Sequence, residues 1–202
     1  MTDAPWSLRG EAIVAFCGGR DVVIGERFDA SPVGPYLSLG IARIGRHGLR
    51  PGLRFSTMVV DNHDRLSAGR RNWGLPGEMG TLSWATVGDE TVLMWHERGV
   101  EVRARARGNG FPLYTPLRLL QHRADGPVVV PSRVRGRFRL ASVDVVMPGD
   151  EPDLARLGGT HRGLAISGLA AQMRPARVAV GHLWSGRAPA SSPDVATYLP
   201  DR

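Results

Sequence analysis

The basic side chains of this sequence limit the chemistry that it can perform. The 202 residues contain 26 lysines and arginines in total, and every one of them is an arginine. An imine with an oxo substrate requires a primary amine that can lose its proton, whereas a guanidinium stays protonated and is not a nucleophile. The only other primary amine of this sequence is the backbone amine of Met1. The residue types therefore argue against covalent imine catalysis.

Other catalytic arrangements lack their residues as well. The six histidines show no close pairing on one face of an expected helix or strand, and the single cysteine, Cys17, has no partner for a disulfide or a zinc site. No Gly-x-Ser-x-Gly elbow is present, and a phosphate-binding P-loop needs a lysine. We therefore expect no bound metal and no cofactor.

Residues 61–80, with the sequence DNHDRLSAGRRNWGLPGEMG, contain a pattern of their own. An Asp-Asn pair is followed by Gly-Arg and then by Trp-Gly-Leu-Pro. This order resembles the acetoacetate decarboxylase-like superfamily, in which Asp-Asn ends a strand, Gly-Arg follows, and Pro-Lys-Lys or Pro-Lys-Glu provides the reactive amine. Residues 34–38, Gly-Pro-Tyr-Leu-Ser, resemble the family's Gly-x-Tyr-x-Glu. The similarity runs from about residue 5 to about residue 184.

The resemblance implies a fold and, at the same time, a lost reaction. Gly77 stands where the family has its Schiff-base lysine, and Ser38 stands where the family has the glutamate that supports this amine. A lyase of this superfamily that works through an imine is therefore not expected. The position next to the missing lysine, Glu78, becomes the candidate catalytic residue, because burial in an apolar cavity would raise its pKa toward a useful range. The alternative is that Glu78 points outward and is solvated.

Five further residues are candidates for binding a substrate in the family's cavity. Arg70 could hold a carboxylate through its planar fork, or could form an ion pair with a nearby aspartate. The aromatic candidates could line a pocket, or could be ordinary core residues. The substrate-binding candidates are Ser38, Arg70, Gly77, Tyr36 and Trp73.

The elements that must position these residues are mainly strands. Short runs rich in β-branched or aromatic residues, separated by Gly, Pro or Asp, are typical of a β-rich α+β protein with a strongly curved antiparallel sheet or barrel and a few short helices. We expect helices at 64–72, 117–121 and 161–173, and hairpin turns at 88–90 and 97–99. The expected strands are 11–16, 21–24, 36–44, 53–60, 81–87, 91–97, 100–107, 128–130, 134–146 and 177–182.

The charge of the chain is strongly positive, with a formal net charge of +7 and a pI of about 11.0. Arginines alternate with apolar residues in 100–107 and in 133–140, a period typical of strands with one buried and one solvated face. A basic sheet face that attracts an anionic partner is the alternative. No sequence motif for nucleic-acid recognition supports nucleic acid as that partner.

Length and composition predict one domain over 1–184 and a flexible tail rich in small residues and proline over 185–202. The absence of an apolar run of about 18 residues predicts no membrane contact, and we expect a cytoplasmic protein. Three functions stay open: an enzyme that binds a small oxo or carboxylate molecule and acts by noncovalent lyase, hydratase or cyclase chemistry, a noncatalytic small-molecule binder, and a basic interaction module. A homo-oligomer is compatible with each.

Overall fold

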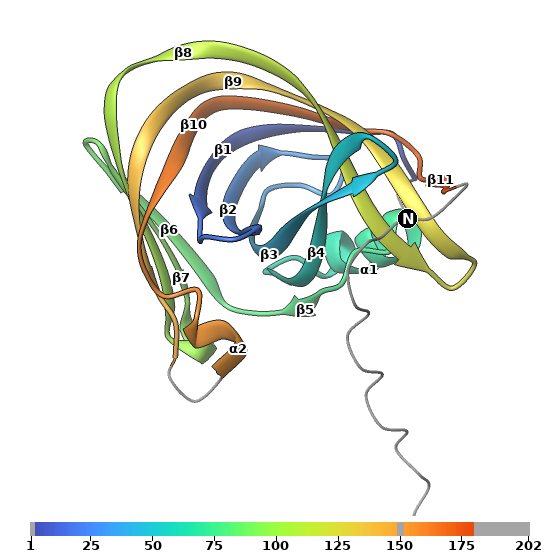
Figure 1. The fold of residues 1–202 in the computed structure, drawn as a ribbon, viewed down its shortest axis with the longest axis horizontal. Coiled ribbons are helices and arrows are strands. Elements are labelled where there is room, and N and C mark those ends of the chain that lie inside the picture. Colours follow the sequence, from blue (N-terminus) through green and yellow to red (C-terminus); the bar gives the residue numbers. More distant parts are fainter. Residues whose placement is uncertain (1–2, 149–151, 180–202) are drawn as a thin grey trace, which may run out of the picture.

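The computed structural model describes residues 3–148 and 152–179. These residues form one 11-stranded sheet with two short helices and one 3-10 turn (Figure 1). The elements in chain order are β1 (Trp6–Phe16), β2 (Asp21–Ala30), β3 (Tyr36–His47), β4 (Arg50–Val60), α1 (His63–Trp73), β5 (Glu78–Met79), β6 (Leu82–Val87), β7 (Glu90–Trp95), η1 (His96–Arg98), β8 (Val100–Arg123), β9 (Gly126–Val146), α2 (Pro152–Ala155), β10 (Gly159–Met173) and β11 (Arg177–Val178).

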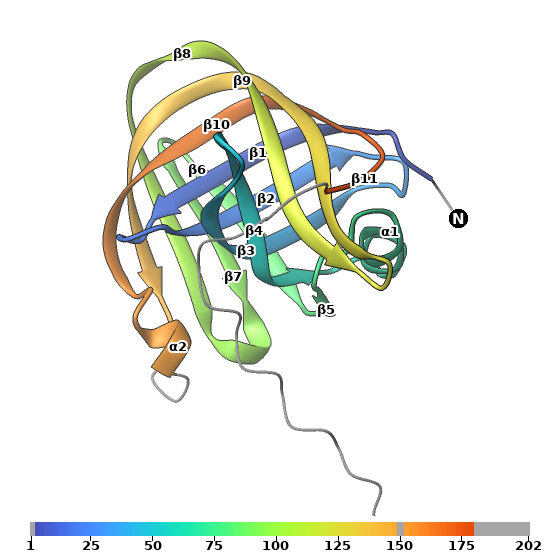
Figure 2. The same ribbon diagram turned by 45° about the vertical axis from the view of Figure 1, so that its right-hand side comes forward.

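The sheet closes on itself into a ring. Its strand order is β11-β9-β10-β1-β2-β3-β4-β8-β7-β6, and β8 also pairs with β9. The β8–β9 ladder is long and antiparallel, whereas β4 meets β8 in parallel through Leu53 and Leu119. The long strands β8, β9 and β10 arch over β1 to β4, and α1 lies beside the lower ends of β8 and β9 (Figures 1 and 2).

The arched strands bend at identifiable points. In β8 the ladder with β9 shifts register between Arg107 and Phe111, and this interval contains Gly108 and Gly110, both with positive φ. Such backbone angles are strained for residues with a Cβ, so glycine permits a bend here that other residues would resist. The two ends of β8 can therefore pack against opposite faces of β1 to β4.

The strands β2, β3 and β4 are buried on both faces. Their side chains alternate between the two faces, as a pleated strand requires. On what we call the packed face, Val23, Leu39, Ile41 and Val59 join an apolar cluster that includes Leu93 and Val102. On what we call the cavity face lie Ile24, Phe28, Tyr36, Met58 and Val60, which belong to a second cluster with Trp6 and Trp73.

The predicted fold class is confirmed, with the refinement that the sheet is mixed rather than purely antiparallel. The predicted helix at 64–72 is α1, and the predicted turns at 88–90 and 97–99 connect β6 to β7 and β7 to β8. The helices predicted at 117–121 and 161–173 are wrong. These residues are strands in β8 and β10, because pairing with neighbours on both sides overrides their Leu- and Ala-rich helical preference.

The predicted strand at 177–182 begins as β11, and its end lies outside the described residues, as does the predicted tail at 185–202. No helix in the described ranges combines the length and apolar character needed to cross a bilayer.

Candidate functional site

A small cavity lies inside the ring of strands, lined by residues of β1 to β4, of β8 to β10 and of helix α1. Its volume is about 70 Å³. Since one water molecule occupies roughly 30 Å³ in the liquid, this cavity suits a ligand of only a few heavy atoms. Most of its lining is apolar, and the polar exceptions include one carboxyl group and one guanidinium group. The lining residues are Leu8, Ile24, Glu26, Phe28, Tyr36, Leu53, Phe55, Met58, Arg65, Leu75, Leu117, Leu119, Ser132, Val134, Ala171 and Met173.

The acid is Glu26, which β2 places on the cavity face between Ile24 and Phe28. The Ser38 hydroxyl donates a hydrogen bond of 2.6 Å to Oε2 of Glu26 from the adjacent strand β3. Burial raises the pKa of Glu26, while the hydrogen bond from Ser38 and the charge of Arg65 oppose this rise. The carboxyl therefore keeps its proton to a higher pH than an exposed glutamate does.

The basic residue is Arg65, which is only 4% exposed and carries a permanent positive charge. Its guanidinium carbon lies 5.5 to 5.9 Å from the ring centroids of Trp6, Tyr36 and Trp73. Nε donates to the Tyr36 hydroxyl at 3.1 Å, and Nη2 contacts the sulfur of Met58 at 3.6 Å. A guanidinium has five N–H donors. Within the described ranges Arg65 has no carboxylate partner and no other oxygen acceptor, so most of its donors are open.

The local sequence explains how Arg65 comes to point inward. Asn62 caps α1 by accepting a hydrogen bond from the backbone N of Arg65 at 2.9 Å. Asp61 accepts from the backbone N of Leu37 at 2.8 Å, which ties the start of α1 to β3. Gly69, one turn further along the helix, leaves space for the guanidinium, because a Cβ there would lie 2.2 Å from Nη1 of Arg65. The Asp-Asn pair thus acts as scaffolding for Arg65.

Tyr36 is the hydrogen-bond acceptor for Arg65 in the cavity. Its hydroxyl accepts from Arg65 and is buried, and burial raises the pKa of Tyr36 to about 12. The phenol consequently keeps its proton at neutral pH. Because the oxygen is already an acceptor for Arg65, its own hydrogen is available to a ligand in the cavity.

Similar proteins appear only at the level of structure. No model of a protein family matches the sequence, and no curated protein matches it. Several solved structures match over most of their length. One is the enduracididine biosynthesis enzyme MppR complexed with pyruvate, with a TM-score of 0.66 and 16% identity over 88% of this chain and 91% of that one. The acetoacetate decarboxylase of Legionella pneumophila has a TM-score of 0.58 and 13% identity over 86% of each chain. An acetoacetate decarboxylase-like enzyme of Sphingomonas wittichii RW1 has a TM-score of 0.59 and 14% identity over 89% of this chain and 95% of that one. The chain has the acetoacetate decarboxylase-like fold.

Three of the residues selected from the sequence lie at the interior of this fold. Ser38 is fully buried against Glu26, and Tyr36 lines the cavity. Trp73 is buried behind Arg65, where it packs edge-on against Trp6 and donates from Nε1 to the backbone O of Arg174 at 2.9 Å. Trp73 therefore supports Arg65 rather than lining the cavity itself.

The other three lie on the outer side of α1 and β5. Glu78 and Arg70 are exposed, and Arg70 donates to the backbone O of Gly77. A Cβ on Gly77 would meet the side chain of Leu66 at 2.7 Å, and none of these three residues lines the cavity of the acetoacetate decarboxylase-like fold. The structure thus gives the solvated alternative for Glu78, while the carboxyl that faces the cavity is Glu26.

Sequence reasoning missed Glu26 and Arg65, although each carries a signal. The apolar alternation of Val22 and Ile24 continues through Glu26 to Phe28, which predicts an acid on a buried face. Arg65 shares a helical spacing with the buried Ala68, Gly69 and Trp73 of α1. In both cases a charged residue occupies a position where the pattern predicts an apolar one. A buried charged residue without an ion-pair partner indicates a functional site.

Proposed function

We propose that the cavity binds a small oxo-carboxylate and promotes proton transfer to and from it without a covalent bond to the protein. The observation that carries this proposal is that Arg65 and Glu26, one cationic and one biased toward a neutral acid, line the same apolar cavity with open hydrogen-bonding capacity. A buried cation without a counter-ion is costly, and a ligand carboxylate would compensate it.

The roles follow from the chemistry of each group. Arg65 binds the carboxylate of the ligand with its open N–H donors. Glu26, in its neutral form, donates its proton to the oxo oxygen, assisted by the Tyr36 hydroxyl, while a C–H proton next to the oxo carbon leaves to water. The enol that forms is the common intermediate of lyase, hydratase and cyclase reactions on such compounds. Pyruvate, with which MppR is described in complex, is of the size and class that we propose.

Binding is tested with pyruvate, and the rings of Trp6 and Trp73 beside Arg65 make tryptophan fluorescence a suitable signal. Arg65→Met removes the charge-assisted hydrogen bonds, each of which contributes roughly 1.5–3 kcal/mol, so we expect pyruvate to bind at least about tenfold more weakly. Arg46→Met removes an equal charge from an exposed position of β3 and should leave binding unchanged. Equal binding by wild type and Arg65→Met would contradict the proposed carboxylate site.

Catalysis is tested apart from binding. Proton NMR in D₂O follows the exchange of the pyruvate methyl hydrogens, which requires the enol. Glu26→Gln keeps the shape and the hydrogen bond to Ser38 but cannot transfer a proton, so we expect binding to persist and exchange to disappear. Glu78→Gln is the matched control at an exposed glutamate. Binding without exchange in the wild-type protein would favour the noncatalytic binder.

The absence of an imine is tested directly. Borohydride with pyruvate should leave no reduced adduct on the protein by mass spectrometry, since the sequence contains no lysine. An adduct, at the amine of Met1 or elsewhere, would overturn the noncovalent mechanism.

A further inference from the structure

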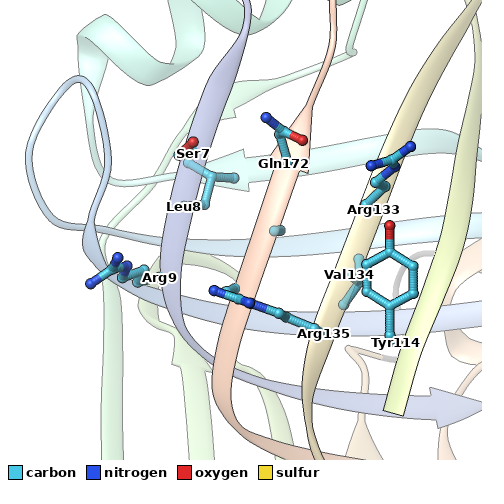
Figure 3. Close-up of a pocket in the computed structure, with 10 residues that line it drawn as sticks. Ser7, Leu8, Arg9, Tyr114, Arg133, Val134, Arg135 and Gln172 are labelled. Carbon is cyan, nitrogen blue, oxygen red and sulfur yellow. The ribbon is translucent and has the colours of Figure 1, made fainter.

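A second hollow lies on the outer face of the sheet, where β8, β9, β10 and β1 run side by side. Its volume is about 290 Å³. Figure 3 shows Arg135 extending across β10 toward Arg9, and the hydroxyl of Tyr114 directed toward Arg133. The residues that line the hollow are Ser7, Leu8, Arg9, Tyr114, Arg133, Val134, Arg135, Ala170, Ala171 and Gln172.

Strand register, rather than flexible loops, places the polar side chains of the hollow. In one row across the four strands, Tyr114 pairs with Arg135, Arg135 with Ala170, and Ala170 with Arg9. Neighbouring strands are about 5 Å apart, so Arg135 and Arg9 start roughly 10 Å apart. The small side chain of Ala170 between them leaves the floor open. Arg135 extends over this floor, whereas the guanidinium of Arg9 lies on the far side of β1 (Figure 3).

A second row lies two residues along the strands. Here Arg133 pairs with Gln172, and Gln172 pairs with Ser7. Arg133 is on the same face of β9 as Arg135, because alternate residues of a strand point to the same side. The second row therefore adds a third guanidinium, an amide and a hydroxyl to the same hollow.

The three arginines have no counter-ion, in contrast to Arg103, Arg105 and Arg139. Arg103 and Arg105 both pair with Glu90, and Arg139 pairs with Asp89. In the described parts of the chain, Arg9, Arg133 and Arg135 make no hydrogen bond or ion pair through their side chains. Glu11 and Asp29 line an adjoining hollow with Arg9 and Arg135, and both carboxylates form ion pairs with Arg27.

Like charges on neighbouring strands repel, so an unpaired cluster of this kind costs stability unless an anion binds to it. A solvated strand face accounts for arginines that point singly into water or pair with a carboxylate. It does not account for three unpaired arginines that line one hollow together with hydroxyl and amide donors. The side chains supply donors on several sides and a formal charge of three.

We propose that this hollow binds the phosphate group of a small phosphorylated molecule. A phosphate has a charge near −2 at neutral pH and several acceptor oxygens that planar guanidinium groups bind in pairs, whereas a carboxylate has one charge and two oxygens. In this proposal the phosphate lies between Arg133 and Arg135 beside the Tyr114 hydroxyl, and Arg9 adds positive charge on the other side of Ala170. The site faces away from the cavity of Glu26 and Arg65 and is independent of the function proposed for that cavity.

The test is calorimetric titration of the full chain with inorganic phosphate, pyrophosphate and acetate at low ionic strength. We expect binding of both phosphate compounds, pyrophosphate more tightly, and none of acetate. Arg133→Gln with Arg135→Gln should weaken pyrophosphate binding by more than about tenfold, because each lost charge-assisted contact contributes roughly 1.5–3 kcal/mol. Tyr114→Phe, which deletes one hydroxyl, should weaken it by a few fold.

The matched control is Arg20→Gln with Arg46→Gln, which removes the same charge from exposed positions at the other end of the β1–β2 hairpin and on β3. An equal loss of binding in this control would show attraction to net charge alone and would overturn the proposal. So would the absence of pyrophosphate binding, or tighter binding to a single-stranded oligonucleotide that the hollow variants leave unchanged. Pyruvate binding should be the same in the wild type and in the hollow variants, so the failure of one site is distinguishable from the failure of the other.

Discussion

The two faces of β2, β3 and β4 belong to the same strands, but one face packs against apolar side chains and the other borders a cavity with polar residues. On the packed face, Val23 and Val59 are almost fully buried in an apolar cluster around Leu93. On the cavity face, Glu26 and Ser38 replace apolar residues; they are hydrogen-bonded to each other, and Glu26 lines the cavity. Desolvated polar groups and empty volume both cost stability. The packed face therefore stabilises the sheet, and this stabilisation offsets the cost of the polar groups and the cavity on the other face.

Of these predictions, the largest change in the free energy of unfolding is expected on the packed face. Leu93 is fully buried, and its Cδ2 would lie 2.8 Å from a Cβ placed on Gly25, so it fills the space above β2. We expect Leu93→Ala to lower the free energy of unfolding by about 2–5 kcal/mol, through lost burial and a new cavity. Chemical denaturation measures this change. A cost below about 1 kcal/mol would show that this face is not closely packed.

On the cavity face, the hydrogen bond between Ser38 and Glu26 is the corresponding target. Ser38→Ala removes the only donor to Glu26 in the described ranges, so we expect the free energy of unfolding to fall by about 1–3 kcal/mol at neutral pH. The pKa of Glu26 should rise further, because the lost hydrogen bond lowers it in the wild type. Denaturation followed at several pH values measures both effects. An unchanged pH profile would contradict the assigned contact.

The raised pKa of Glu26 gives a pH dependence of known sign. The folded protein holds this proton more tightly than the unfolded chain, so the contribution of Glu26 to stability is fully present below its unfolded pKa of about 4.5. It is lost as the pH rises through the raised value, by about 1.4 kcal/mol for each pKa unit of difference. Glu26→Gln should remove this loss of stability with rising pH.

The difference between the wild-type and Glu26→Gln unfolding curves isolates this carboxyl from others. That comparison is needed because hydrogen bonds lower the pKa of Glu90 and Glu97, and these groups stabilise the protein with rising pH. Parallel curves for the two proteins would show that Glu26 is not held in its neutral form.

The smallest effect is expected at Glu78, which lies on the surface of β5. Glu78→Gln should change the free energy of unfolding by less than about 0.5 kcal/mol and leave pyruvate binding as it was, since an exposed side chain away from the cavity affects neither. Denaturation and fluorescence titration check both. A large loss of pyruvate binding would restore the role that the sequence suggested for this residue.

Local patterns predicted most of the strands in sequence, but they missed β10 and the extent of the longest strands. Alternation predicted β3, β4 and the hairpin of β6 and β7 nearly as they are. It ended β8 at residue 107, because the glycines at 108 and 110 look like a loop end, although the strand continues to Arg123. Glycines of this kind occur both at a bend inside a strand and at the end of a strand, so the local sequence does not distinguish the two.

The same distinction applies to the site. The sequence by itself determined that no lysine is available and predicted a curved β-rich fold. Only the tertiary structure decided that Glu78 faces solvent while Glu26 and Arg65 meet in one cavity, and that Arg9, Arg133 and Arg135 share one hollow. The physical reason is that residue types fix which reactions are chemically available, whereas the meeting of side chains distant in sequence depends on strand register and on the closure of the sheet.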